Sequence, residues 1–171
     1  MALLLLLGGA ARAVELQDVP VADYIRLHVV AEDDGDAAQA LKLKVRDAVL
    51  EAARPLLADC PDADAAWERV CDNADALRLA AEDRARVESF VGPVAAETGV
   101  FGFPDRDYGG VFVPAGEYRA LRVVLGAGQG HNWWCVLYPT LCLQGDAAPG
   151  EPVVFYSVIW DWLRGLFGGG A

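Results

Sequence analysis

Apolar and polar positions alternate in "DYIRLHVVAE", near the N-terminal end of the chain. Ile25, Leu27 and Val29 fall on one side of an extended chain, and Arg26 and His28 fall on the other. This alternation predicts a β-strand with one buried face. The following "DDGD" is typical of a turn.

Helical periodicity follows this turn. Asp36 is the predicted N-cap, with Gln39 three residues later as its capping-box partner. From Ala37 to about Arg54 the apolar positions form one stripe, made of Leu41, Val45, Ala48, Val49 and Ala52. The charged residues expected mostly to face water are Lys42, Lys44, Arg46 and Glu51. Pro55 and then Cys60-Pro61 are expected to end or kink the helix.

The rest of the chain divides into a second helical region and a strand-rich region. "DADAAWERVCDNADALRLAAEDRARVESF" predicts more helix, broken near Asp72 and Asn73, with an inward face of Trp67, Val70, Leu77 and Ala81. Residues 94–144 predict three or four short strands, and "PVVFYSVIWDWLRGLF" predicts an amphipathic helix starting at Pro152. The expected fold is therefore α+β, with helices packed on a small, largely antiparallel sheet in the order strand–helices–strands–helix.

The N-terminal segment has the pattern of a secretory signal. An apolar run is followed by small residues and then by Ala11-Arg12-Ala13, which predicts cleavage between Ala13 and Val14. The expected organisation is a signal segment over 1–13, a linker over 14–23, a single α+β domain over 24–167 and a flexible tail over 168–171.

Composition and charge narrow the function classes. The chain has 171 residues, 54% of them hydrophobic and 23% charged, which is typical of one globular domain. The net charge of −11 argues against a nucleic-acid partner and against an anionic membrane surface, because both require a basic patch.

The stretch "GHNWWCVLYPTLC" gathers the side chains best suited to chemistry. The cysteines Cys60, Cys71, Cys135 and Cys142 form no Cys-x-x-Cys pair, so we expect neither a metal nor another cofactor. His131 lies about 13 Å from Cys135 along a strand, too far for a catalytic pair. With no hydrolase or metalloprotease motif in the sequence, we expect no enzyme and no small-molecule substrate.

Cys135 and Cys142 are placed for a disulfide if the chain is exported. Tyr138-Pro139-Thr140 allows a turn between them, and closing the loop would contribute about 2–3 kcal/mol. In a reducing compartment the expectation is two free, buried cysteines. Export therefore favours the disulfide.

Trp133 and Trp134 are adjacent, so on a strand they point to opposite faces. One is expected in the core, and the other is either covered by a helix or exposed as an anchor for a partner. The expected contact surface is the turn-rich side of the domain, with its candidate residues Tyr108, Arg122, His131, Asn132 and one of Trp133 and Trp134. The alternative is that the same residues only stabilise turns.

Several segments together resemble a known family. They are "YIRLHVVAEDD", "QALKLKVRDAVL", "YGGVFVPAGEYRALRVVLGAGQGHNWWCVLYPTLC" and the short C-terminal amphipathic segment. In that order they are similar to the stage II sporulation protein R family of endospore-forming bacteria. Two positions depart from the family pattern, where "AEDD" replaces an Asn-Ser-Asp turn and "YPT" replaces Phe-Pro-Pro.

The resemblance implies a function that composition alone does not indicate. It implies a signalling protein secreted across the forespore membrane into the space between forespore and mother cell. The implied partner is the extracytoplasmic part of a membrane-embedded aspartic-type protease of the mother cell, which then processes pro-sigma-E. The alternative from another class is a secreted cell-wall-binding module or hydrolase, whose aromatic side chains would stack on sugars.

Overall fold

Three helices separate the first strand from the remaining strands in the structure, a computed structural model that describes residues 19–108 and 111–139. A short 3-10 turn, η2, covers Val21–Asp23. The helices are α1 (Asp36–Leu57), α2 (Ala63–Asp72) and α3 (Ala74–Val87). The strands are β1 (Ile25–Val30), β2 (Val94–Phe103), β3 (Arg106–Asp107), β4 (Phe112–Val113), β5 (Gly116–Leu125) and β6 (Asn132–Tyr138).

Four strands form a mixed sheet in the order β2-β5-β1-β6. The two outer pairings, β2 with β5 and β1 with β6, are antiparallel, whereas the central pair of β1 and β5 is parallel. Strands β3 and β4 form a separate two-stranded sheet. The predicted α+β class and the order of strand, helices and strands are confirmed. The signal segment, the C-terminal helix and the tail lie outside the described residues.

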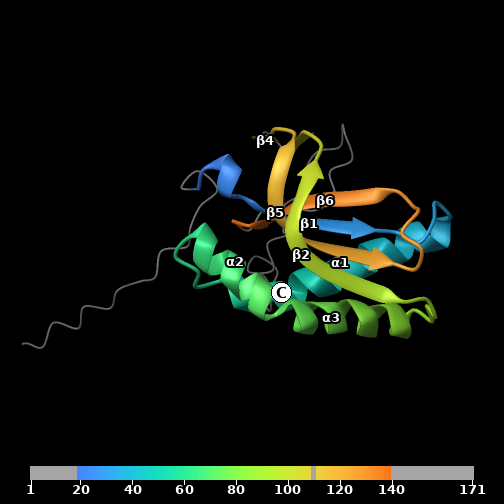
Figure 1. Ribbon diagram of the computed structural model, residues 1–171. Coiled ribbons are helices and arrows are strands. Elements are labelled where there is room, and N and C mark those ends of the chain that lie inside the picture. The colour runs from blue at the N-terminus through green and yellow to red at the C-terminus, as the bar shows by residue number, and fades with distance from the viewer. Residues whose placement is uncertain (1–18, 109–110, 140–171) are drawn as a thin grey trace, which may run out of the picture.

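The helices cover one face of the four-stranded sheet (Figure 1). The guanidinium of Arg46 in α1 lies 4.8 Å from the ring centroid of Trp133, so α1 lies on the Trp133 side of β6. The same face of β1 carries Leu27 and Val29, neither of which is exposed. Fully buried helix residues pack in the same core, among them Val45, Val49, Val70, Leu77 and Ala81.

The prediction that β1 has one buried face is wrong, because both of its faces are covered. All six residues of the strand are buried, including Arg26 at 0% exposure and His28 at 7%. The alternation itself is correct, but β1 is an inner strand, and aromatic side chains of β2, β5 and β6 cover the face opposite the helices. Local periodicity does not contain that information.

Helix α1 differs from its prediction at its N-cap and at Lys42. Gly35 occupies the N-cap position and Asp36 is the first helical residue, so Asp36 is not the cap. The helix includes Pro55 and ends at Leu57, before Cys60-Pro61, which agrees with the predicted end. Lys42 is buried at 6% exposure instead of facing water, because its ammonium group donates to the His131 carbonyl of the neighbouring β5–β6 loop.

Helices α2 and α3 meet at Asn73, where the sequence predicts a break. The carboxylate of Asp62 caps α2 by accepting a hydrogen bond from the backbone N–H of Ala65 at 2.8 Å. Among the described helices, none is both long and apolar enough to cross a membrane.

Replacing Asp62 with Ala should lower the free energy of unfolding by about 1 kcal/mol, since the first turn of α2 loses its side-chain acceptor. Denaturant unfolding measures the change. The matched control is Asp59→Ala, which removes a nearby carboxylate outside any helix cap and should change stability by less than about 0.5 kcal/mol. Equal losses in the two variants would contradict the capping role.

Candidate binding site

One row of side chains crosses all four strands on the face opposite α1, α2 and α3. We call it the helix-free face, because no helix of residues 19–108 and 111–139 lies on it. The strand register aligns Glu97 of β2 with Arg122 of β5, Arg122 with His28 of β1, and His28 with Trp134 of β6. Because neighbours in register point to the same face, these four side chains lie side by side. We call Glu97, Arg122, His28 and Trp134 the cross-strand row.

The outer half of the row is an accessible ion pair. The Arg122 Nε donates to Glu97 Oε1 at 2.5 Å, and both side chains are partly exposed, at 38% and 49%. The Arg122 guanidinium also lies 5.0 Å from the ring centroid of Phe101, four residues after Glu97 along β2. An ion pair at this exposure stabilises the fold little, but its groups are available to a partner.

The inner half of the row is a buried aromatic stack. The rings of His28 and Trp134 are stacked with their centroids 3.7 Å apart, and Phe103 meets both rings edge-on. Burial lowers the pKa of His28, against a hydrogen bond to the Asn132 side chain that raises it. The Nε2 atom of His28 is buried with no hydrogen-bond partner. The neutral ring is therefore the form that fits this stack.

Beside the row, Arg26 is enclosed by aromatic rings. Its guanidinium lies 4.4 Å from the ring centroid of Phe103, 5.0 Å from that of Tyr118 and 5.7 Å from that of Tyr108. The Nε donates to the Cys135 carbonyl at 3.0 Å, while Nη1 is buried with no hydrogen-bond partner. Cation–π attraction and these hydrogen bonds compensate part of the loss of hydration.

Tyr108 joins this cluster to β6. Its hydroxyl accepts a hydrogen bond from Arg26 Nη2 at 2.8 Å and donates to the Trp134 carbonyl at 3.1 Å. Burial raises the pKa of Tyr108, against the neighbouring Arg26, which lowers it. Phe103, Tyr108 and Tyr118, whose rings surround the Arg26 guanidinium, form what we call the aromatic cage.

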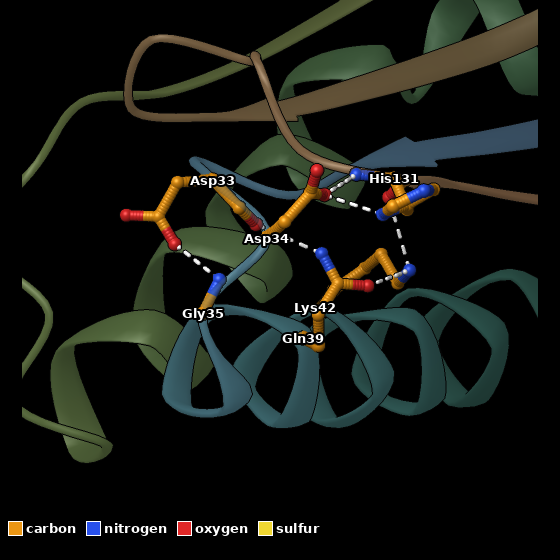
Figure 2. Close-up of polar contacts among 6 residues, drawn as sticks. All are labelled: Asp33, Asp34, Gly35, Gln39, Lys42 and His131. Carbon is orange, nitrogen blue, oxygen red and sulfur yellow. Dashed lines mark hydrogen bonds and ion pairs between the residues drawn. The ribbon is translucent and has the colours of Figure 1, made fainter.

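A second polar cluster fixes one end of the sheet, where the loop after β1 meets the loop before β6. Figure 2 shows Asp34, from the loop after β1, facing His131, from the loop before β6, while Lys42 reaches towards His131 from α1. The His131 side chain pairs with Asp34 at 2.5 Å, and its backbone N–H donates to the same carboxylate. The Lys42 ammonium also donates to Gln39 Oε1 at 2.7 Å.

Gly130 allows the close approach of these two loops. Its N–H donates to the Ala31 carbonyl at 3.0 Å. A Cβ atom at this position would lie 2.1 Å from the Asp33 carbonyl oxygen, so no other residue fits without moving the backbone. The cluster therefore fixes the start of β6, including the position of Asn132.

The structure groups only some of the predicted surface residues. Tyr108, Arg122, Asn132 and Trp134 all lie on or beside the helix-free face. Trp133 points to the other face, beneath Arg46, as the alternation predicts. His131 lies at the end of the sheet, with its side chain 79% exposed. Their role in binding stays a prediction.

The sequence reasoning missed the residues that hold this face together, namely Arg26, His28, Glu97, Phe101, Phe103 and Tyr118. The sequence feature that could have revealed them is a strand with two charged or polar residues at alternate positions, followed much later by the aromatic segments "VFGFP" and "GEY". Pairing those segments requires the strand order, and the sequence alone does not supply it.

Cys60 and Cys71 are free thiols. Cys135 is buried in β6, and Cys142 lies outside the described residues, so their pairing stays a prediction. Within residues 19–108 and 111–139, no group of three or more His, Cys, Asp and Glu side chains is arranged to hold a metal ion. The exposed ion pair beside buried rings suits contact with another macromolecule.

Replacing Tyr108 with Phe should lower the free energy of unfolding by about 1–3 kcal/mol, because the Arg26 guanidinium and the Trp134 carbonyl each lose a partner. Tyr118→Phe is the control, since its hydroxyl makes one neutral hydrogen bond to the Pro114 carbonyl. Chemical denaturation compares them. A smaller loss for Tyr108→Phe than for Tyr118→Phe would contradict the role given to Tyr108.

Stability should fall as the pH is lowered from about 7.5 to 5.5, because His28 binds a proton more weakly in the folded state than in the unfolded state. The contribution is fully present above the unfolded pKa of about 6.5 and is lost below it. The measurement uses a His131→Asn variant as the background, in which His28 is the one histidine that remains in the chain. Adding His28→Phe should remove this part of the pH dependence, and an unchanged profile would refute it.

Comparison with known proteins places the chain in a family. The family described as Stage II sporulation protein R matches residues 21–148. Stage II sporulation protein R of Bacillus subtilis (strain 168) is 34% identical over 159 residues, covering 87% of this chain and 70% of that protein. No solved structure matches the chain. The match includes every described strand and helix, and the family implies a role in sporulation. The chain belongs to the stage II sporulation protein R family.

Proposed function

We propose that this protein is an exported signal of endospore formation that activates a membrane-embedded aspartic-type protease in the mother cell. Activation leads to proteolytic processing of pro-sigma-E. The observation that carries the proposal is the family match over residues 21–148, together with 34% identity to a stage II sporulation protein R. In this proposal the chain crosses the forespore membrane and acts in the intermembrane space.

The helix-free face supports contact with the protease as the means of activation. Glu97 and Arg122 are accessible and carry opposite charges, and they lie beside a rigid stack of His28 and Trp134. A rigid, preorganised surface loses little conformational entropy when it binds. An activator of this kind works by binding the active form of the protease more tightly than the inactive form.

The structure does not favour the alternative of a cell-wall-binding module. Sugar binding by aromatic residues requires an accessible ring face, and on the helix-free face Arg122 lies over Phe101 and His28 stacks on Trp134, although Phe112 of β4 is 59% exposed. A peptidoglycan pull-down with the exported protein tests that alternative directly, and retention that soluble glycan fragments displace would favour it over the signalling proposal.

The signalling proposal predicts a loss of activation when the accessible ion pair changes. The assay co-produces this protein, the protease and pro-sigma-E in a host that does not sporulate, and measures the cleaved fraction by immunoblotting. Arg122→Glu should reduce cleavage about tenfold, because it places two carboxylates together where the partner meets an ion pair.

The matched control is Arg86→Glu, which reverses an exposed, ion-paired arginine on α3, one of the helices that cover the other side of the sheet. Cleavage with this variant should stay within about twofold of the original protein. Trp134→Ala and Trp133→Ala, compared after their folding is verified by circular dichroism, distinguish the two faces of β6. Unchanged cleavage with Arg122→Glu and Trp134→Ala, both folded, would exclude this face as the contact.

A further inference from the structure

Strand β2 is an edge of the four-stranded sheet, and its outer side has no strand beside it among the described residues. It is ten residues long and pairs with β5 at every position from Val94 to Phe103 without a register shift. Natural edge strands are usually short, bulged or charged, because an open edge is a template for pairing with another chain. This edge strand is long and has no bulge, and Glu97 is its one charged residue, so it has little of that protection.

The hydrogen-bond pattern between β2 and β5 determines which backbone groups of β2 face outward. The Gly126 N–H donates to the Pro93 carbonyl at 2.9 Å, one position before the Val94–Leu125 pair. In an antiparallel ladder hydrogen-bonded and non-hydrogen-bonded pairs alternate, so every second residue of β2 directs its N–H and C=O away from β5. Those residues are Val94, Ala96, Thr98, Val100 and Gly102.

The side chains along this edge leave the backbone accessible. Val100 is 62% exposed although it is apolar. Gly102 has no positive φ angle, and a Cβ atom added there would meet no atom within 4 Å. Neither backbone conformation nor internal packing therefore requires glycine at this position, and glycine within a strand commonly marks the close approach of another backbone.

Charge indicates what pairs with the edge. Glu97 is the one charged residue in β2, and its side chain points to the helix-free face, where Arg122 neutralises it. The edge itself is thus uncharged, whereas the whole chain carries a net charge of −11. Two copies would repel each other, which disfavours a second copy and favours a neutral or basic segment of another protein.

We propose that an extended, neutral or basic segment of the partner protease adds to the free edge of β2 as a fifth strand. The inference rests on the proposed function, because it takes the protease as the partner. Main-chain hydrogen bonds to the outward groups from Val94 to Gly102 supply affinity, as in other strand additions. Val100 on one side of the strand and the Glu97–Arg122 pair on the helix-free face supply side-chain contacts, so the added strand would touch both sides of the edge.

The decisive variant is Val100→Pro. It removes an outward N–H without removing a bond to β5, and proline is tolerated at such edge positions. The matched control Val100→Thr keeps the N–H and the β-branched shape. In the co-production assay, Val100→Pro should reduce pro-sigma-E cleavage about tenfold, and Val100→Thr should stay within about twofold of the original protein.

Amide hydrogen exchange on the unaltered chain gives a second readout that needs no variant. The outward amides of Ala96, Thr98, Val100 and Gly102 should exchange rapidly in the isolated protein. They should become protected when membranes containing the protease are added, and membranes without the protease should have no effect. If Val100→Pro does not fold, Thr98→Pro replaces it, because Thr98 also directs its N–H outward.

The possible results separate the two proposals. If the unaltered protein gives no cleavage, the proposed function fails and the edge proposal fails with it. If the unaltered protein and folded Val100→Pro activate equally, only the edge proposal fails. Outward amides already protected in the isolated monomer would show that residues 140–171 or another segment of the chain covers the edge. If light scattering finds a dimer, and dimerisation protects the outward amides of β2 from exchange, the edge pairs with a second copy of this chain and the proposal fails.

Discussion

The helix-free face depends on how the buried charge of Arg26 is accommodated. A guanidinium with no exposed surface is tolerated only where rings and hydrogen-bond acceptors replace water. Phe103 of β2, Tyr118 of β5, the Cys135 carbonyl of β6 and Tyr108 after β3 perform that role. One side chain of β1 thus fixes groups from three other strands, and the rigidity of this face follows from that constraint.

The two faces of the sheet have different physical roles. Against the helices, Leu27, Val29 and their neighbours form an apolar core whose burial drives folding. On the opposite face, cations, rings and one ion pair are held in fixed positions by hydrogen bonds and by the strand register. A surface in which charged groups lie next to buried rings is better suited to recognising another protein than to stabilising this one.

The proposed recognition at this face would suit a role in sporulation that operates through another protein. The cross-strand row ends at Glu97 on β2, so the accessible ion pair and the free backbone edge are adjacent. A partner segment that pairs with the edge would place its side chains beside Arg122. Specificity then comes from the charges and the register, and affinity comes from the backbone.

The sequence by itself determined the elements whose cause is local. The α+β order, the break at Asn73 and the opposite orientations of Trp133 and Trp134 follow from residue periodicity and breaker residues, which act over a few positions. It did not determine that both faces of β1 are buried or that Lys42 is covered, and it did not place Arg26 in an aromatic cage. Those features depend on the parallel pairing of β1 with β5, strands about ninety residues apart. Only the tertiary structure brings such distant side chains into contact.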